Sequence, residues 1–436
     1  MAASLQCLRA IPELSLALEG TQLNATGDQL SGLCTSLREL LKQISKASDT
    51  VHPYAFVHLL RQVLPRFNER TAQGFVQQDA EEFWGELISV LRTRLHGFDK
   101  ENKINETEKF INQYLSGEML ITLKCDEAPN EEPTVSTDTF QKLTVNIGSG
   151  VHTYMVTDIQ NGLTQPVEKN SPSLGRSAMY TQTSRITRLP YYLVTNFVRF
   201  QWKASDNVKA KILKRVKFPF ELDIGLCCTH ELQEKFAPAR QKLKELDDKR
   251  ADEKKLKKDP ELLAKEEAEK ANKRKGSKVL ETHQDRLKIY EALGIDKSLR
   301  EDIGANVSGF YDLVAVLTHV GRTAESGHYI GWVKNENGDW FKYDDDKVSP
   351  CSQEDISKLE GGGDWHSAYI CLYKSKIMDK ENEIEILSEI ARLLDVDIDR
   401  ESLSICMKLC ENGVNPEALA QVFLELKSDS QQQQQQ

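Results

Sequence analysis

The sequence predicts an α+β fold, in which a helical first lobe is followed by a strand-rich section and a short helical block. Up to about residue 96, apolar residues recur at the three- and four-residue intervals of helices. From about residue 113, short runs rich in Val, Ile, Thr and aromatic residues are separated by Asn, Gly and Pro. Helices and strands segregated in this way argue against alternating βαβ units.

The composition is that of a large chain with reduced cysteines. Its 436 residues suggest two to three domains. The 57 basic and 67 acidic residues leave a net charge of −10, which argues against a general nucleic-acid binder. Nine cysteines at scattered spacings indicate free thiols, hence the cytosol or nucleus. We expect neither a secretion signal nor a membrane span, because no apolar run approaches about 20 residues.

Three helices are predicted in the first lobe. Leu5, Leu8 and Ile11 form an apolar stripe that Pro12 interrupts. A second stripe covers 33–41. A third covers 83–91 and follows a Gln-Gln-Asp sequence, in which Asp79 can cap the helix.

The strand predictions fall into two groups, separated by a charged insert. The predicted strands cover 117–124, 140–147, 153–159, 191–200, 311–320, 329–333, 340–343 and 368–373. The insert covers 236–290, and within it about two residues in three of 240–275 are charged, with no aromatics. That composition favours a solvated helix over a packed one, and a basic contact arm is the alternative.

A histidine and an aspartate are predicted to meet at one end of the sheet. His328 begins one strand, a turn follows at 335–338, and Asp344 ends the next strand. Strands joined by a tight turn are antiparallel neighbours, so the two side chains can lie side by side. A carboxylate that accepts from Nδ1–H would fix the tautomer and leave Nε2 to take a proton. The alternative is a surface histidine beside a solvated acidic turn.

Several ordered motifs resemble the ubiquitin-specific protease family of cysteine peptidases, over residues 1 to about 374. The motifs are Gln77-Gln78-Asp79-Ala80-Glu81-Glu82-Phe83, Leu189-Pro190, Val198-Arg199-Phe200, Phe218-Pro219, Tyr311-Asp312-Leu313, Ser326-Gly327-His328-Tyr329, Trp340 through Asp344, and Ala368-Tyr369-Ile370-Cys371-Leu372-Tyr373. The sequences at 6–14 and 361–366 resemble the proteasome-associated branch of that family.

This resemblance implies a papain-like domain with a helical thumb at 1–112 and fingers and palm at 113–374. It implies that His328 is the general base and Asp344 its orienter. Gln78, Asp79 and Tyr329 would bind ubiquitin: Asp79 faces the basic tail, and Tyr329 lines the narrow channel for its Gly-Gly end. For Asp79, a helix cap alone is the alternative. Loops at 201–207 and 322–326 would cover the channel. No metal or cofactor is implied.

The family's nucleophile has no counterpart in the printed residues. Its Asn-Thr-Cys begins a helix whose downstream half matches the first residues here, and Met1 stands two residues after the expected cysteine. Cys7 is expected to be a buried small hydrophobe, and no other cysteine substitutes. The chain as printed is therefore predicted to be inactive, and truncation, mis-start and true pseudoenzyme remain open. No CxxC pair supports a zinc ribbon, since Cys125 stands alone and Cys227 and Cys228 are adjacent. The branch's ubiquitin-like domain has no match either, which leaves the proteasome an uncertain partner.

The end of the chain predicts a second, smaller module. Apolar stripes predict three short helices over 380–427, and 428–436 is a glutamine-rich end without expected structure. The run 403–419 resembles the mitotic-spindle organising protein family, which implies binding to a gamma-tubulin complex component through faces that include Leu403 and Leu419. Cys406 and Cys410 are expected in the core of this module rather than at a metal.

Three functions therefore stand as hypotheses. The first is a deubiquitinase that removes ubiquitin from conjugates through a Cys–His–Asp triad. The second is a non-catalytic ubiquitin-binding protein, and the third is a spindle-pole adaptor with a vestigial protease domain. The expected partners are ubiquitin, ubiquitinated proteins and a gamma-tubulin complex component. The expected location is the cytoplasm, with the spindle pole and the nucleus as alternatives.

Overall fold

A computed structural model describes most of residues 1–376 and little beyond them. The described ranges are 1–23, 27–47, 49–72, 74–147, 153–203, 208–256, 282–321, 327–363 and 365–376, with 398, 402–403 and 405–406. The chain divides into one unit of Met1–Pro238 with Asp296–Lys376 and another of Ala239–Ile295 with Ile377–Gln436. Nearly all of the predicted C-terminal module, including Leu419 and Cys410, lies outside the described residues, as do 204–207 and 322–326.

Helices dominate the first 114 residues, and up to about residue 96 their apolar spacing predicted this. They are α1 (Ala2–Leu8), α2 (Pro12–Gly20), α3 (Gln29–Lys46), α4 (Tyr54–Val63), α5 (Ala80–Arg94) and α6 (Phe110–Tyr114). Pro12 opens α2, where its missing N–H costs no hydrogen bond. Asp28 and Asp79 cap α3 and α5 by accepting from backbone N–H groups two residues on.

The central sheet carries the predicted strands that contain His328 and Asp344. Its strands are β7 (Leu143–Val145), β11 (Tyr192–Phe197), β15 (Glu221–Asp223), β16 (Phe310–Val320), β17 (His328–Lys334), β18 (Trp340–Asp344), β19 (Lys347–Cys351) and β20 (Ser367–Ser375). Within the described residues the order is β19-β18-β17-β16-β20-β11-β7, with β15 beside β16. Nearly every residue of β20 is buried, which explains its almost continuous apolar run.

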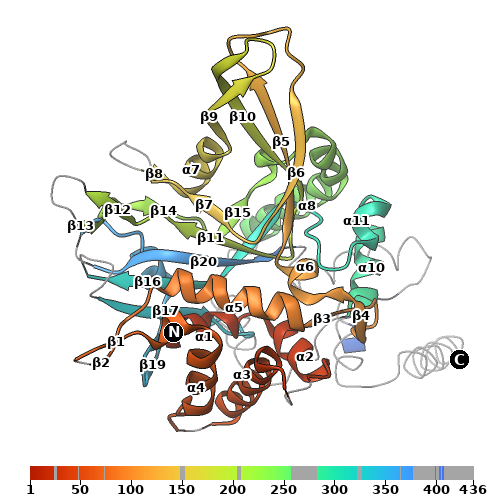
Figure 1. Cartoon of the computed structure of the whole chain (residues 1–436). Helices are drawn as coiled ribbons and strands as arrows, with labels where there is room; N and C mark the ends of the chain where they lie inside the picture. Colours follow the sequence, from red (N-terminus) through yellow and green to blue (C-terminus); the bar gives the residue numbers. More distant parts are fainter. Residues whose placement is uncertain are drawn as a thin grey trace, which may run out of the picture. The chain divides into compact units, whose positions relative to one another are not determined.

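A second sheet is built from long antiparallel strands and projects from the first unit, above the central sheet in Figure 1. Its strands are β5 (Gly117–Cys125), β6 (Thr134–Phe140), β9 (Thr164–Ser171) and β10 (Arg176–Arg188). In the same view α1 to α4 lie below the central sheet. A small core of Cys125, Ala178 and Tyr180 lies in the projecting sheet.

The predicted strand at 153–159 is wrong. Only Thr153–Tyr154 is extended (β8), and Met155–Gly162 forms helix α7, which buries Met155 and Ile159 on one face. These residues are four apart, so the apolar run has helical as well as strand periodicity. The other short strands are β1 (Arg70–Thr71), β2 (Gly74–Phe75), β3 (His96–Phe98), β4 (Ile104–Lys109), β12 (Phe200–Lys203), β13 (Val208–Lys211) and β14 (Val216–Lys217).

The charged insert is helical where it is described. Helix α8 (His230–Leu256) continues into it from the first unit, and α10 (His283–Ala292) begins with a capping box formed by Thr282 and Asp285. Helices α11 (Lys297–Glu301) and α12 (Gln353–Ser357) belong to the first unit. In the described part of the chain, no helix combines the length and the hydrophobicity that crossing a membrane requires.

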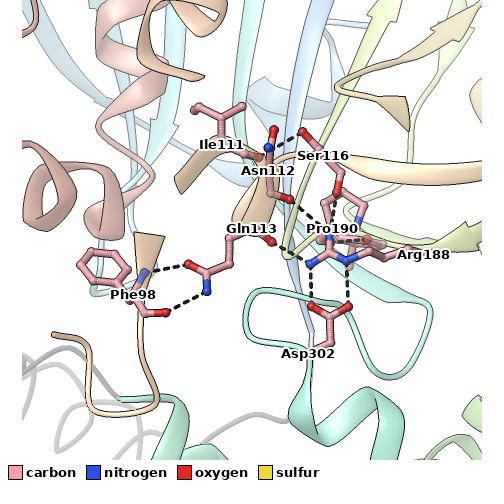
Figure 2. Close-up of polar contacts among 9 residues, drawn as sticks. Phe98, Ile111, Asn112, Gln113, Ser116, Arg188, Pro190 and Asp302 are labelled. Atoms are coloured by element: carbon pink, nitrogen blue, oxygen red, sulfur yellow. Dashed lines mark hydrogen bonds and ion pairs between the residues drawn. The ribbon is translucent and has the colours of Figure 1, made fainter. Parts of the chain in front are cut away.

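Arg188, at the end of β10, joins the projecting sheet to the helical lobe. Its guanidinium donates to both carboxylate oxygens of Asp302, at 2.8 and 2.7 Å, and to the carbonyls of Ser116 and Gln113, at 2.6 and 2.9 Å (Figure 2). The Gln113 amide pairs in turn with the backbone N–H and C=O of Phe98, each at 2.9 Å. Since these groups come from four separate segments, one side chain aligns strands with helices.

Candidate active site

His328 and Asp344 meet at the end of the central sheet, as the turn between their strands predicted. Nε2 of His328 lies 2.6 Å from Oδ1 of Asp344. The two side chains remain 43% and 30% exposed, so a substrate can reach them. A histidine oriented by a carboxylate is the base–orienter pair of nucleophilic catalysis.

Strand register and a tight turn produce this pair. Gly331 of β17 lies opposite Tyr343 of β18, so Asp344 continues along β17 towards His328. Asp344 also pairs with Lys347 across a two-residue turn, whose first residue, Asp345, has φ of 54°. Aspartate tolerates this left-handed conformation better than most side chains. The turn takes Asp345 and Asp346 out of the strand, and Asp344 alone faces the histidine.

The predicted tautomer is wrong. Asp344 accepts from Nε2, not from Nδ1, so Nδ1 is the nitrogen left to take a proton. Among the described residues, Nδ1 makes no hydrogen bond. The tautomer depends on which side of the ring meets the carboxylate, and spacing along the chain does not determine that.

Lys342 holds the second oxygen of the same carboxylate. Its Nζ lies 2.9 Å from Oδ2 of Asp344. Hydrogen bonds from His328 and then from Lys342 lower the pKa of the Asp344 carboxyl, which keeps it ionised at neutral pH. Sequence reasoning missed Lys342, although its position two residues before Asp344 in a strand places both on one face.

Asp79 is a helix cap and also a link between two lobes. Its Oδ1 accepts from the Glu81 N–H at 2.7 Å, and both its oxygens accept from the Tyr369 hydroxyl at 2.9 and 2.8 Å. Burial, and then the Asp79 charge, raise the pKa of Tyr369. Gln78 donates to Glu69 at 3.2 Å, while Gln77, not singled out by the sequence, donates to the Gly327 carbonyl at 3.0 Å.

An aromatic cluster lies between Asp79 and the histidine pair. The rings of Phe200 and Tyr329 lie 5.3 and 4.8 Å from the imidazole of His319, and Tyr329 lies 6.0 Å from Tyr369. His319 is fully buried, and among the described residues neither of its nitrogens has a hydrogen-bond partner. Burial, and then the Lys211 charge, lower the pKa of His319 to about 4, so it is neutral at pH 7. Sequence reasoning did not identify His319.

Helix α1 packs directly on β17. A Cβ at Gly331 would lie 3.1 Å from the carbonyl oxygen of Ala3, so glycine lets the two backbones approach this closely without a shift. The charges of Asp345 and Asp79 both act on the amino group of Met1, so both carboxylates lie near the start of α1. Figure 1 shows the same proximity of the N-terminus to β17.

Cys7 is structural, as predicted. It is 1% exposed, and burial raises the pKa of its thiol to about 12. None of the cysteines in the described part of the chain is hydrogen-bonded to His328. Three of them, Cys125, Cys227 and Cys228, are buried as free thiols. No group of three metal-ligating side chains occurs among the described residues.

Residues 1–373 match the family model for ubiquitin carboxyl-terminal hydrolase, and residues 381–427 match that for mitotic-spindle organizing gamma-tubulin ring associated proteins. Ubiquitin carboxyl-terminal hydrolase 6 of Schizosaccharomyces pombe is 42% identical over 382 residues, covering 86% of this chain and 76% of that protein. Its Arabidopsis thaliana namesake is 36% identical over 384 residues, covering 87% and 76%.

The C-terminal segment has a relative of its own. Mitotic-spindle organizing protein 1 of Danio rerio is 55% identical over 47 residues, which are 11% of this chain and 63% of that protein. Among solved structures, a SAGA DUB module bound to ubiquitin aldehyde has a TM-score of 0.53 at 15% identity, covering 86% of this chain and 66% of that one. This last likeness concerns the fold alone. The chain belongs to the ubiquitin carboxyl-terminal hydrolase family and carries a mitotic-spindle organizing module at its C-terminal end.

Proposed function

We propose that residues 1–373 recognise the C-terminal tail of ubiquitin and cleave the bond that follows it by thiol chemistry. The observation that carries this proposal is the 2.6 Å contact between His328 and Asp344, which leaves Nδ1 as the base within a fold of this family. The nucleophilic thiol is the one that the family places before Met1, at the start of α1. The start of α1 lies near Asp79 and Asp345, whose charges act on the amino group of Met1, and this supports that placement.

The chemistry then follows the general course of thiol hydrolases. Nδ1 of His328 takes the thiol proton, and the thiolate attacks the carbonyl carbon at the end of the tail. The resulting imidazolium is stabilised by Asp344, and it returns the proton to the leaving amine as the thioester forms. Water, deprotonated by the same nitrogen, then hydrolyses the thioester and releases the thiol.

The surroundings of Asp79 support a binding site for the tail. The Asp79 carboxylate is suited to an arginine, because a guanidinium can donate to both of its oxygens. Tyr329, Tyr369 and Phe200 form an aromatic cluster next to Asp79, with both tyrosines buried, and so little room beside the carboxylate would favour a substrate end without side chains. Gln78 lies beside Asp79 and completes the residues proposed to contact ubiquitin.

The experiment compares the printed chain with one extended by a short segment that carries Asn-Thr-Cys, its cysteine two residues before Met1. The printed chain should not react with a thiol-directed ubiquitin probe, whereas the extended chain should be labelled and should hydrolyse a ubiquitin–fluorophore ester. His328→Ala in the extended chain should lower turnover by roughly 10³-fold or more, because base and nucleophile act as a unit. An unlabelled, folded extended chain would contradict the proposal, and labelling of the printed chain that Cys7→Ala abolishes would reassign the nucleophile.

Non-catalytic binding of ubiquitin is the second candidate for this domain. The aromatic cluster and Asp79 need no thiol in order to bind the tail, so the printed chain should bind ubiquitin weakly in calorimetry. Binding without turnover in the extended chain would favour this candidate over hydrolysis.

For residues 381–427, we propose binding to a gamma-tubulin complex component, which would bring the chain to spindle poles. The match to the spindle-organizing family supports this proposal. The full chain should co-purify with such a component, and a Leu403→Ser, Leu419→Ser double variant should not. A chain without 431–436 is the control, and circular dichroism must show equal helix content. Equal capture by the double variant would contradict the proposal for these two leucines.

A further inference from the structure

The carboxylate of Asp344 has two partners, one on each oxygen. Oδ1 lies 2.6 Å from Nε2 of His328, and Oδ2 lies 2.9 Å from Nζ of Lys342. Hydrogen bonds from His328 and then from Lys342 lower the pKa of Asp344.

The ammonium of Lys342 lies over the indole ring of Trp332. Lys342 lies opposite Trp332 in the register of β18 with β17, and its Nζ lies 5.6 Å from the centre of the Trp332 ring. At this distance a cation is attracted to an aromatic face. Trp332 is 6% exposed, so this contact is partly shielded from water.

Two further side chains fix the orientation of that indole. Its Nε1–H donates to Oγ1 of Thr318 at 3.0 Å, and the Trp332 and His366 rings meet edge to face at 5.5 Å. Thr318 and His366 are also in contact, with 3.4 Å between Oγ1 and Nδ1. Burial, and then the charge of Lys342, lower the pKa of His366 to about 4. A neutral His366 at pH 7 does not repel the ammonium.

We propose that Lys342 is a positioning residue for the His328–Asp344 pair: held over Trp332, it binds Oδ2 of Asp344, so that Oδ1 faces Nε2 of His328 and Nδ1 remains the base. Trp332 acts through Lys342, and Thr318 and His366 act through Trp332. The catalytic consequence rests on the proposed function, but the geometry does not. Without Lys342, the partly exposed carboxylate can rotate, and its hold on one imidazole tautomer weakens.

The first test needs no nucleophile and uses the printed chain. Ring nitrogen chemical shifts report the tautomer of His328, and the carboxyl carbon shift reports the titration of Asp344. In Lys342→Met, the Nε2–H tautomer should lose its predominance, and the pKa of Asp344 should rise, because one of the two hydrogen bonds that lower it is lost. Lys342→Arg should restore both. Lys347→Met is the matched control, because Lys347 lies on the same hairpin with no ion pair to Asp344 among the described residues, and it should change neither signal.

A second pair of variants tests the indole. Trp332→Phe keeps an aromatic ring but removes the N–H that Thr318 accepts, so it should shift the tautomer ratio in the same direction by a smaller amount. Trp365→Phe is the control, because Trp365 is 63% exposed and contacts His366 without touching Lys342. The proposal is overturned if folded Lys342→Met has the parent's tautomer ratio and Asp344 titration, or if Lys347→Met matches its effects.

The extended chain with Asn-Thr-Cys separates this inference from the proposed function. Lys342→Met should lower kcat there about tenfold with little change in KM, since Lys342 acts on the base and not on ubiquitin. An extended chain that lacks all activity, together with the expected NMR shifts, would reject the proposed function and keep the positioning role. Full activity in Lys342→Met would reject the positioning role alone.

Discussion

Two carboxylates, one in the loop between β5 and β6 and one at the end of β18, show how different donors give the same group different uses. Glu131, in the loop, accepts hydrogen bonds from the hydroxyls of Ser171, Ser173 and Tyr180. Asp344, in the central sheet, is shared between an imidazole and an ammonium. Hydroxyls that do not titrate near pH 7 make Glu131 a fixed connection, whereas His328 gives Asp344 a partner that can accept a proton.

Both carboxyl groups have lowered pKa values, so the shift alone does not identify a site. The three hydroxyls lower the pKa of Glu131 to about 2, while His328 and Lys342 lower that of Asp344. Perturbed groups occur in structural networks as well as in active sites. The difference lies in the partner, because Asp344 contacts a histidine whose Nδ1 makes no hydrogen bond within the described ranges, whereas Glu131 contacts hydroxyls.

The largest expected effect is a difference in catalytic activity between variants of Asp344 and variants of Glu131. In the extended chain with Asn-Thr-Cys, Asp344→Asn should slow labelling by a ubiquitin probe about 10²–10⁴-fold, because an amide can hold the wrong tautomer. Glu131→Gln should stay within about threefold of the parent, since it touches no reacting group. Equal losses in both variants, with equal thermal stability, would show that the comparison is mistaken.

The next effect tests whether Arg188 joins the projecting sheet to the helical lobe. Arg188→Ala leaves the Asp302 charge and the carbonyls of Ser116 and Gln113 without their donor, and should cost about 3 kcal/mol of unfolding free energy. Arg176→Ala, which breaks an ion pair with Glu127 from a side chain that is 60% exposed, should cost less than about 0.5 kcal/mol. Denaturant unfolding measures both, and similarly small losses of unfolding free energy in the two variants would show that Arg188 does not connect these parts of the molecule.

Asp79 serves as a helix cap and also as a proposed contact for ubiquitin, and a pair of substitutions can separate these two roles. Asp79→Asn keeps a good helix cap but removes the charge, so unfolding free energy should change by less than about 0.5 kcal/mol while ubiquitin affinity falls about fivefold. Asp79→Ala should lose the affinity and also about 1 kcal/mol of stability. Calorimetry and denaturant unfolding measure the two quantities. Parent-like affinity in Asp79→Asn would leave Asp79 as a cap that also accepts from Tyr369.

The smallest expected effect is a loss, at low pH, of the stability that Glu131 contributes. The pKa of Glu131 is lower in the folded chain than its ordinary 4.5, so its contribution is complete above about pH 4.5 and is lost as the pH falls towards 2. The protection of amides in β9 and β10 from hydrogen exchange, relative to the intrinsic rate at each pH, should therefore fall over this range, and Glu131→Gln should show the lower protection already at pH 7. Unchanged protection in β9 and β10 between pH 4.5 and 2 would contradict this role of Glu131.

The accuracy of the sequence predictions follows the distance between the residues concerned. The helices around the apolar stripes at 33–41 and 83–91, the second capped by Asp79, were predicted correctly, because caps and apolar spacing act within a few residues. His328 and Asp344 are 16 residues apart across one turn, and their meeting was predicted for the same reason. The segment 153–159 was predicted wrongly, since two periodicities fit it and only burial of Met155 and Ile159 selects the helix.

Contacts between distant segments account for what the predictions lacked. Asp79 and Tyr369 are 290 residues apart, and Arg188 and Asp302 are 114 apart. Their meeting depends on how whole sheets and helices pack, which no local pattern encodes. The amino-acid order alone determines the family, the main elements and the identity of the candidate base and orienter. Packing determines which imidazole nitrogen meets the carboxylate of Asp344, and it places His319 in the aromatic cluster, because side-chain orientation is settled only when neighbouring strands and helices close around it.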